Sequence, residues 1–515
     1  MPESDLAGQV EDVLSVAPDE FQAEVEADAE VIVEEVDDGT FDNPQAIIGF
    51  EYEFYAVDAD SGALRRVPRR LLDLIGFEKE LGLHNAEMST SPQPLNTHGL
   101  AAQEAEVKAR LSAAEDRTGA EGMRLVSDAM WTVPPEGETA RQYLTDSVSD
   151  RGVRIASNMS DSVRYHAMAN SEGEAGMCLD APHVSLSADT VMPESLITSI
   201  QPHYQVPHAR DLPTYFQYAI RIAGPLLALG VNSPFFPPDL YDDDATADEI
   251  LADGYDEHRI GVFETVLNRS VDESDKVRFP RDFDSVEEAV GRIASDRTIV
   301  PMPVSTTDRF DDEFAHFRHK HGTYWRWVRP VFGGATRSAA NARIEFRPIA
   351  AQPTVRDSIA FQAAFAGLLE STYRREHPVR HLDWVVAKDN FYDAMEEGLD
   401  ADLYWITNDG KETTDHEEVY SDIFAHAKDG LQMRGLSDQQ AAKYLYPLRQ
   451  RARHRLTPAS WKRERVRDEV DGGADFEDAV YEMQSQYVER QSETLIDGTF
   501  ADWVGRGDTE MERED

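Results

Sequence analysis

The stretch Ile48-Gly-Phe-Glu-Tyr-Glu-Phe54 decides the fold, because its apolar and polar residues alternate with the period of a β-strand. Its aliphatic and aromatic members would face a core, whereas Glu51 and Glu53 would face the opposite side. Two carboxylates about 7 Å apart on one strand face repel each other unless a cation lies between them. A hard cation such as Mg²⁺ suits that position. The stretch therefore predicts a half-buried strand whose polar face is either solvated or metal-binding.

The same alternation recurs in three other segments. The residues that share a polar face are Arg343, Glu345 and Arg347 in segment 342–348, His183, Ser185 and Ser187 in segment 182–187, and Glu87 and Ser89 in segment 85–90. Arginine beside glutamate is not typical of a face that is merely solvated, since a guanidinium binds carboxylate or phosphate through two parallel hydrogen bonds. We therefore predict one antiparallel sheet with an apolar back on helices and a front suited to metal and phosphate.

The chain divides by composition into three parts. Residues 1–44 hold 15 acidic residues and no Lys or Arg, which predicts a disordered acidic tail or, as the alternative, a frayed helix. Residues 45–500 are interpreted as one catalytic α+β domain, in which strand-like runs alternate with helices. From about residue 354 the apolar residues follow helical spacing, so this domain is expected to end in a helical portion. Residues 501–515 form a second acidic tail in this interpretation.

Charge excludes several classes of partner. The chain has 515 residues, with 98 Asp and Glu against 50 Lys and Arg, and its formal net charge is −48. Nucleic acid and anionic membranes would be repelled, so neither is an expected partner. Only nine of the cations are lysines, and a dense carboxylate surface with little lysine is typical of proteins that stay hydrated in multimolar salt. An acidic protein of an ordinary cytoplasm is the alternative.

The halophilic interpretation makes a prediction about salt. Crowded surface carboxylates repel one another at low ionic strength, and added salt screens that repulsion. We therefore expect the melting temperature to rise steeply between dilute buffer and molar KCl, as measured by circular dichroism. A melting temperature that stays flat over this range would exclude a halophilic protein, without bearing on its chemistry.

Several other classes are disfavoured by what the sequence lacks. Cys178 is the only cysteine, so an intrachain disulfide, a cysteine zinc site and a dithiol relay are excluded. No apolar run approaches the ~20 residues of a membrane span, and the N-terminus does not resemble a signal peptide. A soluble cytoplasmic protein is expected. Neither a Walker loop nor a Gly-x-Gly-x-x-Gly fingerprint is present, so any nucleotide would bind through metal and arginines.

Five short motifs, in this order, resemble glutamate–cysteine ligase family 2. They are Gly49-Phe-Glu-Tyr-Glu53, Glu87 before Ser-Thr-Ser-Pro, Leu227-Ala-Leu-Gly-Val-Asn-Ser-Pro-Phe235, Arg343-Ile-Glu-Phe-Arg347 and Gln352-Pro-Thr354. The resemblance covers roughly residues 45–490 and implies the glutamine-synthetase-like fold, a saddle-like antiparallel sheet packed on helices. It also implies an ATP- and Mg²⁺-dependent carboxylate–amine ligase, which phosphorylates the γ-carboxylate of glutamate before an amine, most simply that of cysteine, attacks.

The resemblance also implies roles for particular residues. Metal ligands would be Glu51, Glu53, Glu87, Glu345 and His183, and catalytic contacts to phosphate or carboxylate would come from Arg347 and Arg259. Substrate or nucleotide contacts would come from Arg343, Ser185, Asn232 and Arg329. The oligomeric state is not implied.

Two departures from the family pattern leave alternatives open. The family commonly has His-x-His where this chain has Pro182-His-Val-Ser185, and its Trp-Asp-x-Arg corresponds to Arg326-Trp-Val-Arg329. These changes bear on the identity of the substrate. Two alternatives to the leading interpretation therefore remain: a ligase of the same fold that uses another amine, and a relative that only binds ligand.

Overall fold

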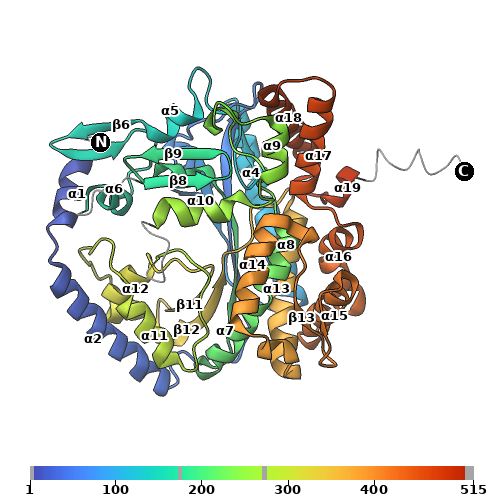
Figure 1. Cartoon of the computed structure of the whole chain (residues 1–515). Coiled ribbons are helices and arrows are strands. Elements are labelled where there is room, and N and C mark those ends of the chain that lie inside the picture. Colours follow the sequence, from blue (N-terminus) through green and yellow to red (C-terminus); the bar gives the residue numbers. More distant parts are fainter. Residues whose placement is uncertain (1–4, 172–176, 269–274, 505–515) are drawn as a thin grey trace, which may run out of the picture.

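The computed structural model describes residues 5–171, 177–268 and 275–504, which surround a curled, antiparallel, eight-stranded sheet (Figure 1). Its main path runs β11-β12-β10-β1-β3-β2, and β4 and β5 also pair with β1. The strands are β1 Ile47–Asp58, β2 Glu78–Lys79, β3 Asn85–Ser89, β4 Gln93–Pro94, β5 Met123–Val126, β10 Ile200–Gln205, β11 Val328–Gly333 and β12 Asn341–Phe346. The long strand β1 is central because it contacts four others, which makes the expected half-buried strand the core of the sheet.

The apolar face of the sheet packs on helices. Ile48, Phe50, Tyr52 and Phe54 of β1 are all buried, as their alternation predicts. Helix α13 (Val355–Arg375) crosses behind β10 and β1, and Phe346 of β12 stacks on Phe365 with ring centroids 4.5 Å apart. Helices α7 (Leu212–Arg221) and α4 (Thr97–Ala120) extend this layer toward the two edges. Burial of this face leaves the polar face of the same strands for a site.

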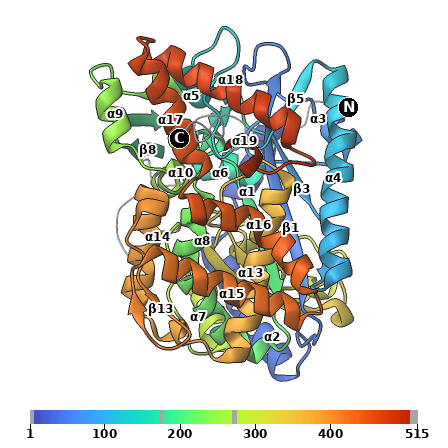
Figure 2. The same cartoon turned by 90° about the vertical axis from the view of Figure 1, so that its right-hand side faces the viewer.

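The C-terminal part is helical, as expected from about residue 354. Its helices gather on one side of the sheet, at the right of Figure 1 and in front in Figure 2. After α13 they are α14 Trp384–Glu397, α15 His416–Met433, α16 Asp438–His454, α17 Pro458–Asp471, α18 Phe476–Thr494 and α19 Ala501–Val504. The predicted α+β class with a helical C-terminal portion is therefore confirmed. Of the expected C-terminal tail, residues 501–504 form α19 and the rest lies outside the described residues.

The remaining elements are short and surround the sheet. The other helices are α3 Arg69–Ile75, α5 Ala140–Thr145, α6 Val163–Asn170, α8 Ala223–Gly230, α9 Ala247–Asp253, α10 His258–Leu267, α11 Val286–Ser295 and α12 Ala315–His321. Separate hairpins are formed by β6 Ser147–Asp150 with β7 Val153–Ala156, β8 Met177–Ala181 with β9 Val184–Ala188, and β13 Trp405–Ile406 with β14 Glu412–Thr413. Among the described residues, no helix has the length and apolarity that crossing a membrane requires.

The N-terminal segment differs from the predicted disordered tail. It forms helix α1 (Leu6–Leu14) and helix α2 (Pro18–Asp37), and α2 packs against α11 and α12 (Figure 1). Phe21, Val25, Ala29 and Ile32 recur at helical spacing and are buried, so the apolar stripe was present among the acids. The stripe was overlooked because the many acidic residues, most of them on the solvent-facing side of α2, dominate the composition of the segment. The expectation of a solvated tail is therefore corrected for residues 5–44.

Helix α2 should contribute measurably to stability. Ile32 is fully buried, so Ile32→Ala removes buried methyl groups and leaves a cavity. We expect a loss of about 2–3 kcal/mol in the free energy of unfolding, measured by denaturant titration. Glu34→Ala on the exposed side of the same helix is the control, and we expect it to change this energy by less than about 0.5 kcal/mol. Equal, small effects of both changes would show that α2 does not pack on the body in solution.

Candidate active site

Strand register brings the predicted polar residues into rows across one face of the sheet. In the first row Glu53 of β1 lies opposite Glu87 of β3. In the second row Glu51 lies between Ser89 and Gln201. Paired residues of antiparallel strands share a face, with Cβ atoms about 5 Å apart. The two glutamates of β1 therefore meet further polar groups from both neighbouring strands.

A third row crosses the opposite half of the sheet. His203 of β10 pairs with Gly49 on one side and with Glu345 on the other, and Glu345 pairs with Arg329 of β11. His203 Nε2 lies 3.4 Å from Glu51 Oε1, which joins this row to the second. Gly49 packs against His203: a Cβ atom added to Gly49 would lie 3.4 Å from His203 Cβ, which is an ordinary van der Waals distance.

An acidic cavity of about 330 Å³ lies over the first two rows. Six glutamates line it, namely Glu51, Glu53, Glu78, Glu80, Glu87 and Glu194. Arg329 and Arg347 are the cations of its lining. Phe263 and Leu267 of α10 and the segment 192–196 close it on the side away from the sheet. The arrangement offers many hard oxygen donors to one small volume, which is the donor set that Mg²⁺ prefers.

Crowding of these carboxylates shifts their ionisation. Burial, followed by the charges of Glu80 and Glu51, raises the pKa of Glu87 well above its usual range. Burial and the charge of Glu53 raise the pKa of Glu80 to about 7. Burial with the charges of Glu80 and Glu53 raises the pKa of Glu194 to about 8. A divalent cation held by these groups would remove the repulsion, so the residues present fit a magnesium site.

Two arginines hold Glu345 beside the acidic cavity. Arg329 Nε and Arg347 Nη1 donate to Glu345 Oε1 at 2.9 and 2.6 Å, and Arg347 Nη1 also donates to Gln201 Oε1 at 2.6 Å. Burial alone would raise the pKa of Glu345, but the charges of Arg329 and Arg347 outweigh it and hold that pKa well below the usual range. Glu345 thus pairs with two arginines that line the cavity, and it is not itself part of that lining. The geometry therefore favours a role in orienting these arginines over the expected role of metal ligand.

Arg259 stands behind this pair. It lines a small recess that adjoins the acidic cavity, together with Glu53, Glu194 and Arg347. Its guanidinium donates to the carbonyl oxygens of Arg347 and Pro348. The side chain is almost fully buried, so the contacts of Arg259 fix the backbone at the end of β12 where Arg347 emerges.

A second cavity, of about 470 Å³, continues the polar face toward the other end of the strands. It shares Glu51 and Ser89 with the acidic cavity, but its cations are Arg309, Arg318 and Arg343. Arg343 Nε lies 3.4 Å from His203 Nδ1. One end of the face therefore suits a cation and the other end suits a phosphate or carboxylate, which is the polarity needed to hold a metal-bound anion.

Comparison with known proteins identifies the family of the chain. The model of glutamate–cysteine ligase family 2 matches residues 47–493. The chain belongs to this family. Among solved structures, glutamate–cysteine ligase from Francisella tularensis in complex with AMP is similar with a TM-score of 0.50 and 12% identity, over 88% of this chain and 91% of that one. A bifunctional glutathione synthetase from Pasteurella multocida has a TM-score of 0.46 and 14% identity, over 90% of this chain and 55% of that one. No curated protein matches the sequence.

Membership of the family establishes a ligase fold, but two predicted site residues lie elsewhere. His183 occupies the turn of the β8–β9 hairpin with φ of 60°, and its Nε2 lies 2.9 Å from Asp253. Ser185 lies in β9, opposite Asp180. The hairpin is a separate two-stranded sheet, so neither residue lies on the face that holds Glu51. The prediction that they belong to the metal and substrate site is corrected, because alternation predicts a strand but not which sheet it joins.

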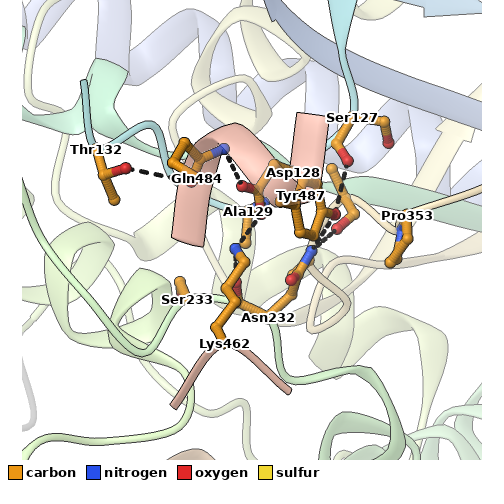
Figure 3. Close-up of polar contacts among 12 residues, drawn as sticks. Ser127, Asp128, Ala129, Thr132, Asn232, Ser233, Pro353, Lys462, Gln484 and Tyr487 are labelled. Carbon is orange, nitrogen blue, oxygen red and sulfur yellow. Dashed lines mark hydrogen bonds and ion pairs between the residues drawn. The ribbon is translucent and has the colours of Figure 1, made fainter. Parts of the chain in front are cut away.

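Asn232, the third displaced residue, is fully buried in a polar network (Figure 3). Its Nδ2 donates to the carbonyl of Ala351 at 2.8 Å and to Tyr487 Oη at 3.2 Å, and its own carbonyl accepts from Lys462 Nζ at 2.7 Å. It lines neither of the two cavities on the sheet. The family motif that contains Asn232 therefore belongs to a buried network that packs beneath the sheet, and the prediction that Asn232 contacts substrate is corrected.

The sequence prediction missed the strand that completes the site. Strand β10 carries Gln201 and His203 on the polar face, and it lies between β1 and β12. Pro202 concealed it, because proline inside a run argues against a central strand. Its signal was the alternation of Gln201, His203 and Gln205 with apolar and aromatic residues. Glu80 and Glu194 were missed because they stand outside any alternating run.

Proposed function

We propose that this family member is an ATP-dependent glutamate–cysteine ligase, which forms γ-glutamylcysteine. The observation that carries the proposal is the polar sheet face, where facing carboxylates at one end adjoin arginines at the other. Glu51, Glu53 and Glu87 would hold Mg²⁺, which would shield the phosphates of ATP and stabilise charge in phosphoryl transfer. The AMP in the Francisella tularensis ligase of similar fold supports a nucleotide substrate.

The proposed reaction has two steps. The γ-carboxylate of glutamate attacks the γ-phosphorus of ATP, so that an acyl phosphate forms and ADP leaves. The amine of cysteine then attacks the acyl carbon, an amide forms, and phosphate and a proton leave. Arg347 and Arg329, which Glu345 orients toward the cavity, would bind the transferred phosphoryl group or the reacting carboxylate. Arg259 would act on this step through the backbone of Arg347.

Arg347→Lys tests the role of the guanidinium. Arg347 Nη1 contacts Gln201 and Glu345 together. The lysine side chain is shorter and ends in a single ammonium group, which cannot make both contacts and also face the cavity. We expect kcat to fall about tenfold, on the order of 1.4 kcal/mol, while the magnesium concentration for half-maximal activity stays near the wild-type value. An unchanged kcat would remove Arg347 from the reaction.

A ligation assay tests the proposed function. The purified protein is incubated at high KCl with ATP, Mg²⁺, glutamate and a panel of amines, and ADP release and product mass are measured. We expect ADP release that depends on cysteine and a product with the mass of γ-glutamylcysteine. A different preferred amine would reassign the acceptor, and no ADP release with any amine would favour a relative that only binds ligand. Ser185→Ala is the matched control, since Ser185 lies outside the sheet face, and it should keep full activity.

A further inference from the structure

A large cavity of about 1040 Å³ borders helix α10 on a side next to the one that borders the acidic cavity. Phe263 and Leu267 of α10 line the acidic cavity, whereas Glu264 and Asn268 line the large one. The segment 324–326 divides in the same way, because Trp325 faces the acidic cavity and its two neighbours face the other. The two spaces therefore share a wall but are separate sites.

The charge of this cavity is opposite to that of the chain. Acidic residues outnumber basic residues about two to one in the sequence. Of the charged residues that line the cavity within the described part of the chain, three are acidic, namely Glu264, Asp275 and Asp296. Six are basic, namely Arg278, Arg281, Arg292, Arg297, Arg326 and Lys388. Such a concentration of cations in one hollow of a strongly acidic protein favours an anionic ligand.

Two of the acidic residues are already compensated within the protein. Asp296 forms ion pairs with Arg326 at 2.9 Å and with Lys276. Burial raises the pKa of Glu264 to about 7, and Trp327 Nε1 and Tyr392 Oη both donate to its Oε1, at 2.7 and 2.9 Å. Asp296 thus neutralises one lining cation, Arg326, and Glu288 of α11 pairs with a second, Arg292.

Two of the cations remain available to a ligand. Within the described part of the chain, neither Arg297 nor Lys388 has a carboxylate within 4 Å. Arg297 is exposed in the segment that follows α11, and Lys388 is half-buried on α14, where its Nζ lies 5.7 Å from the ring centroid of Trp384, so they reach the cavity from two different elements. Two cations on separate elements can bind one phosphate group from two sides.

Aromatic rings line the same cavity. Trp384, Lys388 and Tyr392 lie four residues apart on α14 and therefore share one helix face. The Arg281 guanidinium lies 4.6 Å from the ring centroid of Trp384, and that of Arg326 lies 4.3 Å from the ring centroid of Tyr324. Nucleobases stack on such aromatic and guanidinium surfaces, whereas a simple inorganic anion gains nothing from them.

We propose that this cavity binds a nucleoside phosphate, at a site separate from the catalytic face. Its phosphate would be held by Arg297 and Lys388, and its base would stack on the wall formed by Trp384 and Tyr324. Its volume is at the upper end of the range typical of small-molecule sites, so a whole nucleotide fits. Cations supply the binding charge here, so the site needs no divalent metal.

The experiment measures the binding of radiolabelled ADP by equilibrium dialysis in the presence of EDTA, at the lowest KCl concentration that keeps the protein folded. Without metal the six glutamates of the acidic cavity repel phosphate, but the arginines of the second cavity on the sheet face could still bind ADP. Only the loss of binding in a variant of the basic cavity therefore assigns the site. We expect saturable binding that the double variant Arg297→Glu/Lys388→Glu weakens at least tenfold. The matched control Arg210→Glu/Arg490→Glu changes the net charge equally at two exposed sites and should bind ADP like the wild type.

Three outcomes would overturn the proposal: no saturable binding in EDTA, equal binding by the double variant, or equal weakening by the control. Inorganic phosphate and adenosine are measured as competitors, and each should compete more weakly than unlabelled ADP. If the double variant does not fold, as judged by circular dichroism, Lys388→Gln gives the same test with a milder change, with an expected loss of about threefold or more. Because ligation plays no part in the assay, its result is independent of the proposed function.

Discussion

Glu51→Gln is expected to lower the rate of ligation by about 10²-fold or more, on the order of 3 kcal/mol of transition-state stabilisation. Glu51 occupies the middle of the sheet face, between Ser89 and Gln201, and it lines both cavities of that face. The substitution preserves size and one oxygen but removes the charge that would hold Mg²⁺. The magnesium concentration for half-maximal activity should therefore rise, and a magnesium titration of initial rates measures both effects.

The same variant makes a separate prediction for stability. Glu51 contributes to the repulsion that raises the pKa of Glu87. Burial raises the pKa of Glu51 as well, but its contact with His203 and the charge of Arg347 outweigh burial and hold that pKa below its usual range. The ionised carboxylate is therefore favourable in the folded protein, and the melting temperature without ligand should fall slightly at neutral pH. Glu34→Gln on the exposed side of α2 is the control and should change neither quantity. Turnover within twofold of the wild type in Glu51→Gln would refute the metal assignment and with it the main support for the ligase.

The sequence predicted the two strands that carry most of the site, because their alternation is strong. Strands β1 and β12 each bury one parity and present glutamate or arginine on the other, so their faces could be predicted without knowing their neighbours. Arg329 and Glu87 were also predicted, through motifs near these strands. Pairing is a long-range property, however, and the pairing of β10 with both β1 and β12 joins residues that lie about 140 to 155 positions apart. The local alternation of apolar and polar residues does not indicate which strands pair with one another.

The errors have the same physical origin. The β8–β9 hairpin has a regular alternation like that of β1, yet it closes on itself, and His183 at its turn therefore lies outside the main sheet. In α2 the acidic side outweighed the apolar stripe, so composition predicted a solvated chain where packing against α11 and α12 decides the structure. Asn232 was assigned through its motif, although burial could only be known once α17 and α18 were placed over it.

The support beneath Asn232 contains a fully buried ion pair, between Lys462 of α17 and Asp128 of the segment after β5 (Figure 3). Lys462 Nζ donates to Asp128 Oδ1 at 2.5 Å and to the carbonyl of Asn232 at 2.7 Å. Asp128 Oδ2 accepts from Gln484 Nε2 at 3.1 Å and from Tyr55 Oη at 3.3 Å. Burial lowers the pKa of Lys462, and the charge of Asp128 opposes this shift. The pair thus connects the helical C-terminal portion to strand β1.

Asp128→Asn and Lys462→Met should each lower the free energy of unfolding by about 3–5 kcal/mol, because each leaves one buried charge without its partner. Their double variant should cost less than the sum of the two, since it leaves no uncompensated charge. Denaturant titrations of the three variants at one salt concentration measure these energies. The exposed pair of Lys411 and Glu418 is the control, and breaking it by Lys411→Met should cost less than about 1 kcal/mol. If Asp128→Asn lowered the free energy of unfolding by less than about 1 kcal/mol, like the control, water would have access to the pair. The buried network would then contribute little to the stability of the sheet.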